Sequence, residues 1–216
     1  MLRLISIESF KLFRKLKSWL GPLLILVLVL VAFPLSIDIS QYDLEKFYFS
    51  IIVVSLLMTA FVATEGMFEE DFEDGSLEQE FLIEKDFYKL ALCKIIVYVL
   101  LIGVPIAFIG SIFSFANGVA IGSFPKVFLL LSLSNLLLFN LFAFGNSLSI
   151  NKGAMLGVLS SLPLALPIII LLGRAIRSVQ FGDGFSEMIA LMAGVGLIVS
   201  ALMPLIISAA LKTHID

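Results

Sequence analysis

The sequence predicts an all-α membrane protein with six transmembrane helices. Of its 216 residues, 60% are hydrophobic and only 14% are charged, and the mean hydropathy is +1.12. A water-soluble globule of this length needs more polar side chains to cover its surface. The apolar blocks are continuous rather than alternating, so they favour helices over the strands of a membrane barrel.

Six apolar blocks are long enough to cross a hydrocarbon core of roughly 30 Å, which takes about 20 residues of helix. The spans are expected at residues 20–37, 47–65, 90–115, 124–148, 154–173 and 188–211. Together they form a single transmembrane domain that covers residues 1–216. An even number of spans places both termini on one side of the membrane.

Residues 1–18 are expected to form a basic amphipathic helix that lies in the headgroup layer. Glu8 is the only acid there, and the helix periodicity gathers apolar side chains on one side. These side chains are Leu2, Ile5, Leu12, Phe13, Leu16 and Trp19. The alternative is a positive flank that only fixes the topology. The apolar run that follows is too long for a signal peptide and is expected to be a retained span.

The distribution of Lys and Arg favours cytoplasmic termini. Ten of these residues fall on the side of the termini and four on the other side, and positive charges near span ends prefer the cytoplasm. The external connections are then expected at residues 38–46, 117–123 and 174–187. All three are too short to form an external domain.

The connection at residues 66–89 is expected to be a cytoplasmic coupling loop. The window from Glu65 to Asp86 holds ten of the seventeen acidic residues. Asp74-Gly75 is a turn signal, and Ser76 with Gln79 matches a capping box that opens a helix. We therefore expect a helix end, a tight turn and a short second helix.

Several kinds of site are excluded or disfavoured. Setting Gly75 at the sixth position of an EF-hand places Phe72 and Phe81 where oxygen ligands are required, so no calcium site is expected. Cys93 is the only cysteine, which excludes an intramolecular disulfide. There is no Walker A sequence, so ATP is expected to act only through a partner chain. No catalytic or metal-binding residues are predicted, because a run of charges is usually a solvated face.

The predicted spans carry no ionisable residue away from their ends, which disfavours a proton- or ion-coupled transporter. Their polar and small residues are interpreted as packing residues, because amides hydrogen-bond between helices and glycines allow close approach. These are Asn135, Asn140, Gly194 and Gly196. The prolines could also bend the helices in a transport cycle, and the two roles stay open for Pro105, Pro163, Pro167 and Pro204.

The order of these features resembles the CcmB family, the haem exporter B subunit of cytochrome c maturation. The resemblance begins with the basic N-terminal helix and with Phe33-Pro-Leu-Ser36 at the outer end of the first span. It continues with Glu65 at the inner end of the second span. Asp-Gly-Ser-Leu-Glu-Gln from Asp74 to Gln79 is its most specific part, and Lys94 opens the third span.

This resemblance implies an ABC-type complex in the bacterial inner membrane. Two copies of the chain would pair with two copies of a separate ATPase, CcmA, alongside the membrane proteins CcmC and CcmD. ATP hydrolysis would be tied to release of the haem-loaded chaperone, CcmE. No cofactor is expected to be bound directly. Haem could be a handled ligand, although the only histidine, His214, lies near the C-terminus.

The leading hypothesis is a non-enzymatic subunit that converts conformational change in a bound ATPase dimer into helix movement. Apolar side chains of the acidic stretch would anchor the ATPase, and the acids would orient it. The expected coupling residues are Glu65, Phe68, Phe72, Asp74, Gly75, Ser76, Leu77, Glu78, Gln79 and Phe81. The alternatives are a passive scaffold for the haem-handling complex and the permease of an exporter for a lipid or another amphiphile. Contact with membrane lipid is expected, and none with nucleic acid.

Overall fold

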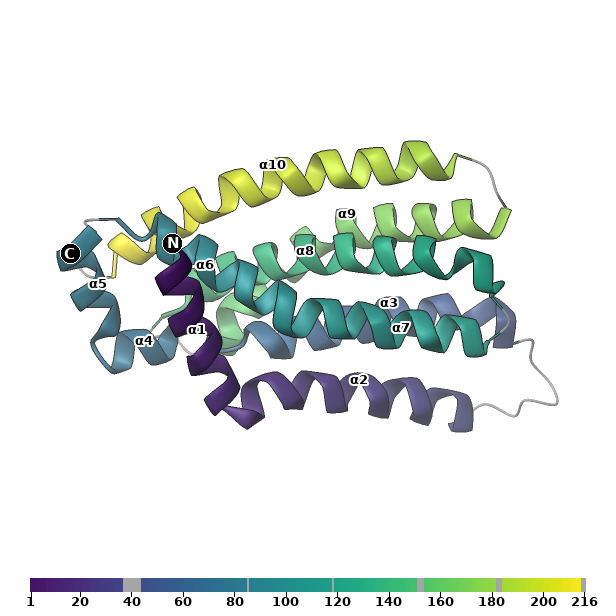
Figure 1. Ribbon diagram of the computed structural model, residues 1–216, viewed down its shortest axis with the longest axis horizontal. Coiled ribbons are helices and arrows are strands. Elements are labelled where there is room, and N and C mark those ends of the chain that lie inside the picture. Colours follow the sequence, from purple (N-terminus) through teal and green to yellow (C-terminus); the bar gives the residue numbers. More distant parts are fainter. Residues whose placement is uncertain (37–43, 85, 118, 151–153, 182–183, 215–216) are drawn as a thin grey trace.

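Helices account for every regular element in the part of the chain that the computed structural model describes, which is residues 1–36, 44–84, 86–117, 119–150, 154–181 and 184–214. The helices in chain order are α1 Leu2–Arg14, α2 Leu16–Ser36, α3 Leu44–Thr64, α4 Glu69–Glu73, α5 Ser76–Glu84, α6 Tyr88–Tyr98, α7 Val104–Ala116, α8 Phe124–Leu148, α9 Ala154–Phe181 and α10 Phe185–Lys212. The long helices run side by side, and both termini lie at one end, called here the terminal end (Figure 1).

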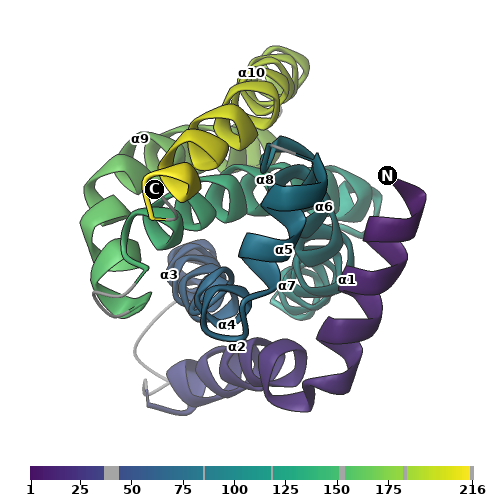
Figure 2. The same cartoon turned by 90° about the vertical axis from the view of Figure 1, so that its left-hand side faces the viewer.

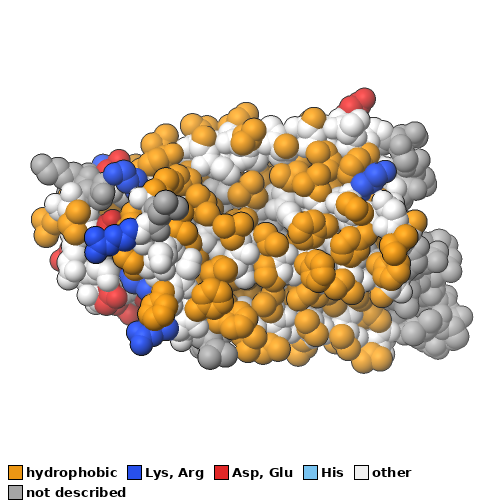
Figure 3. Space-filling model, in the orientation of Figure 1, with side chains coloured by type: hydrophobic (Ala, Val, Ile, Leu, Met, Phe, Trp, Pro, Cys, Tyr) orange, Lys and Arg blue, Asp and Glu red, His pale blue; other side chains and the backbone are white. Residues whose placement is uncertain are grey.

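Within the described residues, six stretches are long and apolar enough to cross a membrane, which agrees with the predicted number of spans. They are Ser18–Ser36, Tyr48–Glu73, Tyr88–Ala116, Ile121–Leu148, Ser161–Val179 and Phe185–Lys212. Hydrophobic side chains cover the middle of the molecule, and charged groups gather toward its ends, mostly the terminal end (Figure 3). This is the surface expected of a protein whose middle faces hydrocarbon.

The fifth span differs from its prediction. Helix α9 continues through Arg174 and Arg177 as far as Phe181, so much of the predicted external connection at 174–187 is helical. Both arginine side chains are exposed. Extending the helix therefore buries neither charge, and long cationic side chains near a span end can reach the interface.

A break near Lys15 also changes the expected N-terminal helix. Helix α1 ends at Arg14, and the backbone of Lys15 leaves the helical region, with φ −95° and ψ 76°. Trp19 therefore belongs to α2, although its ring still contacts Phe13 edge-on at 6.0 Å between centroids. Helix α1 lies across the direction of the long helices (Figure 1).

Helix α8 is the centre of the bundle. In the most apolar part of this helix, 67% of the residues are buried inside the protein. The corresponding share is 17% in α2 and 17% in α10. Its Asn135 side chain donates from Nδ2 to the carbonyl oxygen of Gly103, at 2.7 Å. Gly103 ends a π-helical turn, Val99–Gly103, that joins α6 to α7. The prediction that buried amides link helices is confirmed here. Asn140 donates from Nδ2 to the carbonyl oxygen of Leu136 in its own helix, at 2.8 Å, and also to the hydroxyl group of Ser200 in α10, at 3.5 Å.

Helices α8 and α9 approach each other closely at Gly145 and Gly157. A Cβ atom built on Gly157 would lie 2.0 Å from the carbonyl oxygen of Gly145, so no larger residue fits. The predicted packing glycines lie elsewhere. Gly196 makes an ordinary contact with Leu136, and a Cβ on Gly194 would meet nothing within 4 Å. The packing interpretation is therefore wrong for Gly194 within this chain.

Candidate functional site

The candidate functional site is the terminal end of the bundle, where the acidic stretch lies against α1, α6 and α10. Viewed along the bundle, α4 and α5 stand in front of the long helices, and α1 runs along one side (Figure 2). The structure has the predicted turn at Asp74-Gly75 and the predicted short helix after it, α5; in addition, a short helix α4 that was not predicted lies between the end of α3 at Thr64 and the turn. We call residues 65–84 the acidic segment.

Four charged side chains from three helices meet at this end and form what we call the ion cluster: Glu8 and Lys11 of α1, Asp71 of α4 and Lys94 of α6. The Lys94 Nζ lies 2.6 Å from Asp71 Oδ2 and 3.1 Å from Glu8 Oε2. The Lys11 Nζ lies 3.0 Å from Asp71 Oδ1 and 3.9 Å from Glu8 Oε1. Two acids and two bases balance, so the cluster has no net charge.

Burial makes this cluster more than a surface ion pair. Side chains are only 5% exposed at Lys94 and Glu8 and 7% exposed at Asp71. A buried charge is tolerated only when it is paired and hydrogen-bonded. Lys94 meets both conditions, because its ammonium also donates to the carbonyl oxygen of Met67, at 3.1 Å. The cluster therefore fixes α4 to α1 and α6 at once.

Two further contacts hold the acidic segment in place. Lys15, which follows α1, forms an ion pair with Glu70 of α4. The backbone N–H of Phe68 donates to Asn146 Oδ1 at the end of α8, at 3.1 Å. The segment is thus joined to the central helix of the bundle as well as to α1.

The predicted apolar anchors need a correction. Phe68 and Leu77 are fully buried, at 0% and 1% exposed, and both belong to the hydrophobic core of the terminal end. Phe72 and Phe81 are half-buried and pack on that same core. These side chains hold the acidic segment on the bundle, because apolar area already buried there is not free to dock a partner.

The exposed apolar residues of the acidic segment are Leu82 and Ile83, near the end of α5. They are 79% and 76% exposed. Four of the predicted polar coupling residues are also exposed: Glu65, Asp74, Glu78 and Gln79. The outer surface of the segment therefore combines an exposed apolar tip near the end of α5 with exposed polar and acidic side chains elsewhere along it.

The turn between α4 and α5 is built by Asp74 and Gly75. Gly75 has φ +75°, a conformation that costs other residues strain and that glycine adopts freely. Asp74 Oδ1 accepts a hydrogen bond from the backbone N–H of Ser76, at 2.8 Å. Hydrogen bonds from Ser76 to the carboxylate lower the pKa of Asp74. The predicted capping box is thus replaced by a cap from Asp74.

A second contact links the far end of the acidic stretch to α10. The hydroxyl group of Ser208 donates to Asp86 and accepts from the backbone N–H of Phe87. The hydrogen bond from Ser208 is the main reason that the pKa of Asp86 is lowered. Lys212 Nζ lies 3.6 Å from the same carboxylate. The last turns of α10 are therefore tied to the start of α6.

The described residues offer no cluster of His, Cys, Asp and Glu side chains that could hold a metal ion. Cys93 is buried at the start of α6, and the ring of His214 lies 3.2 Å from the carbonyl oxygen of Ser147. Contacts at the terminal end thus join the acidic segment to four helices of the bundle: α1, α6, α8 and α10.

Comparison with known proteins identifies the family of this chain. The family model described as CcmB protein matches residues 2–214. The chain belongs to the CcmB family. Heme exporter protein B of Pseudomonas aeruginosa is 28% identical over 98% of this chain and 96% of its own length. Heme exporter protein B of Haemophilus influenzae is 28% identical over 94% and 93%, and that of Paracoccus denitrificans is 25% identical over 88% of each chain.

In this CcmB-family chain, sequence reasoning missed the ion cluster. The sequence pattern marks Lys94 only as the residue that opens the third span, and Glu8 only as a lone acid in a basic helix. One signal points to the cluster: a lysine inside an apolar helix needs a carboxylate partner. Only the fold shows that Glu8 and Asp71 are the acids that both lysines share.

Proposed function

We propose that the chain is the transmembrane subunit of an ABC-type complex for cytochrome c maturation. In this role it couples ATP hydrolysis by a separate, CcmA-like subunit to the handling of haem or to release of a haem-loaded chaperone. The support for the pathway is membership of the CcmB family and the name Heme exporter protein B that its relatives carry. Two copies of the chain and CcmC-like and CcmD-like proteins complete the proposed assembly.

The ion cluster is the observation that supports coupling. An ATPase that moves α5 also moves α4, because a turn of only two residues joins the two helices. Asp71 of α4 is bonded to Lys94 in the third span and to Lys11 of α1. Movement at the surface is therefore transmitted to a membrane span and to the N-terminal helix through short, buried contacts. A flexible loop would absorb that movement.

The proposed docking surface is Leu82 and Ile83 together with the exposed acids of the same segment. Exposed apolar side chains next to charge are typical of an interface whose centre is apolar and whose rim is polar. The acids favour a basic groove on the ATPase and set its orientation. This replaces Phe68 and Leu77 as the apolar contacts.

Copurification of the ATPase subunit from detergent tests this surface. The double variant L82S/I83S is expected to lose most of the copurified ATPase and its stimulated ATP hydrolysis, because docking loses its apolar centre. The matched control is Ile121→Ser, since Ile121 is similarly exposed, at 75%, at the opposite end of the bundle. Equal recovery of the ATPase with the double variant and the control would contradict the docking assignment.

The cytochrome c content of cells separates coupling from a passive scaffold. A complex whose ATPase subunit binds ATP but cannot hydrolyse it is expected to assemble and to leave cytochromes immature. Normal maturation by that complex would favour the scaffold. Normal maturation in cells that lack the chain would instead favour an exporter of another amphiphile.

A further inference from the structure

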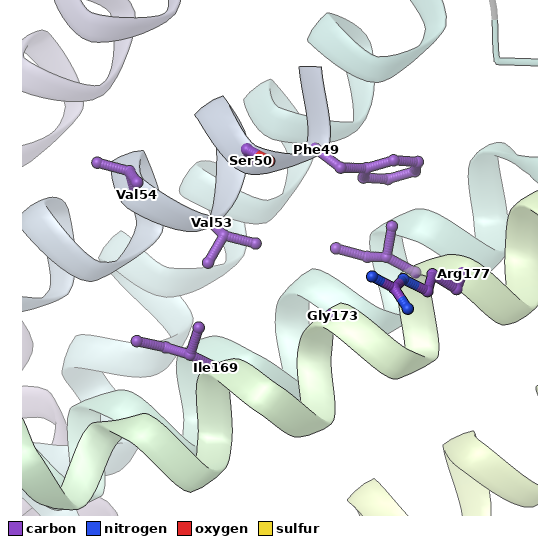
Figure 4. A pocket seen from close by; sticks show the side chains of 8 residues that line it. Phe49, Ser50, Val53, Val54, Ile169, Gly173 and Arg177 are labelled. Carbon is purple, nitrogen blue, oxygen red and sulfur yellow. The ribbon is translucent and has the colours of Figure 1, made fainter. Parts of the chain in front are cut away.

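A cavity of about 380 Å³ lies between α3 and α9, away from the ion cluster and the acidic segment. Phe49 and Val53 of α3 form part of one wall, and Ile169 and Ile176 of α9 form part of the other. The two helices face each other across the space, and the guanidinium group of Arg177 lies beside it (Figure 4).

The walls of this cavity are apolar except at one end. Phe49 and Ile176 are buried, at 7% and 4% exposed, whereas Val54 is 46% exposed, so the cavity is open on one side as a groove. Gly173 contributes no side chain, and a Cβ atom there would meet nothing within 4 Å. The groove is therefore wide where Gly173 lies.

Arg177 gives the groove its charge. It lies two residues before the end of the fifth span at Val179, and the last turns of α9 lie at the end of the molecule away from the termini (Figure 1). No carboxylate among the described residues forms an ion pair with it. Its side chain is exposed, so the charge can reach the headgroup layer while the groove below lies at the depth of hydrocarbon.

We propose that this groove binds one anionic phospholipid, with the phosphate on Arg177 and part of an acyl chain between α3 and α9. From Ile169 to Arg177 the helix rises by roughly 12 Å, which is within the roughly 15 Å of one leaflet of a 30 Å core. The groove thus has the length of a partial acyl chain and a cation at headgroup level. The inference goes beyond the coupling role and does not depend on haem.

Two features identify the bound molecule as an anionic lipid: the positive charge of Arg177 and the apolar surroundings of the groove opening. Apolar side chains are exposed on α9 along the groove below the arginines, including Leu166 at 57% and Ile170 at 62% exposed, so this part of the opening faces lipid rather than water. A zwitterionic lipid would fill the apolar part equally well. A lipid with a net negative headgroup gains in addition from the arginine, which attracts anionic headgroups.

Native mass spectrometry of the full chain tests the site after equilibration with mixed micelles of phosphatidylglycerol and phosphatidylcholine in equal amounts. The wild-type chain is expected to retain one phosphatidylglycerol in preference to phosphatidylcholine. Arg177→Gln should lower that preference about fivefold, the effect expected of one interfacial cation. Arg174→Gln is the matched control, because Arg174 is exposed on the same helix but does not line the groove.

A second variant tests the apolar part independently. Gly173→Leu places a side chain in the open groove without meeting protein atoms at its Cβ, so it should displace both lipids while the chain stays folded. Equal preference in the wild type and in Arg177→Gln would overturn the proposal, and so would lipid retained by Gly173→Leu. Disulfide-linked dimers of a Val54→Cys variant in native membranes would also overturn it, because the groove would then be an interface between two copies.

Discussion

Lys94 is the residue on which the terminal end depends most. Its ammonium group is buried between two carboxylates that belong to α1 and α4. Lys11 shares both acids but is 38% exposed, so water weakens its contribution. Lys94 therefore neutralises two carboxylates that are almost fully buried. Its removal leaves Glu8 and Asp71 with Lys11, which is partly exposed, as their basic partner.

Lys94→Met tests this. The side chain keeps its length and loses its charge, so the cluster keeps two buried acids with one base. Removing one partner of a buried pair typically costs about 3–5 kcal/mol. We expect a large drop in the midpoint of thermal unfolding, measured in detergent by loss of helical circular dichroism.

Lys15→Met is the matched control for that measurement. Lys15 pairs with Glu70 where both side chains are about half exposed, at 45% and 55%, and an exposed pair contributes about 0–1 kcal/mol. The control should unfold close to the wild type. If both variants lost the same stability, the cluster would have no special role in holding α1, α4 and α6 together.

At the scale of an element, the proposed coupling depends on the turn between α4 and α5, through which movement of α5 would reach the bundle. The turn is short, and Asp74 closes it by accepting from Ser76. Phe81 of α5 also stacks on Phe87, with ring centroids 5.3 Å apart. Helix α5 is thus held at both ends, by the turn that joins it to α4 and by Phe87 before α6.

Gly75→Val is expected to distort this turn. A β-branched residue at φ +75° costs roughly 1–2 kcal/mol of backbone strain. Because α4 stays anchored by Asp71, the strain should change the direction of α5 rather than unfold the chain. We expect reduced stimulation of the partner ATPase, measured as ATP hydrolysis by the reconstituted complex.

Gly194→Val provides the comparison. Gly194 lies within α10, and a Cβ there meets nothing within 4 Å. This variant should keep full partner-stimulated hydrolysis. Full activity of Gly75→Val as well would show that the turn does not transmit ATPase movement.

At the scale of the whole molecule, six spans place α5 and both termini on one side of the membrane. The excess of positive charge predicts that this side is the cytoplasm, the side on which an ATPase partner finds ATP. The orientation of the termini is a prediction, and the structure supplies the positions that test it.

Cysteine labelling in whole cells tests the orientation. Leu82 and Ile121 are 79% and 75% exposed and lie at opposite ends of the bundle, and the native Cys93 is 0% exposed and should stay unlabelled. A membrane-impermeant maleimide is expected to label Ile121→Cys in intact cells and Leu82→Cys only after lysis. The reverse pattern would place the acidic segment outside the cytoplasm and would exclude docking of an ATPase there.

The sequence by itself determined the number of spans, the turn at Asp74-Gly75 and the family. These features depend on the length of apolar runs and on local turn chemistry, which a single stretch of chain carries. The ends of helices depend on more than the local sequence. Helix α9 continues past its predicted end, which is possible because its arginine side chains stay exposed. The break at Lys15 was not visible in the helical periodicity.

Only the tertiary structure decided which side chains of the terminal end are inside. Glu8, Asp71 and Lys94 are far apart in the sequence, and their pairing follows from how α1, α4 and α6 pack. Phe68 and Leu82 are both strongly apolar residues of one acidic segment, yet the first is buried and the second exposed. Hydropathy does not predict this difference, because it records the preference of a side chain and not the neighbours that the fold provides.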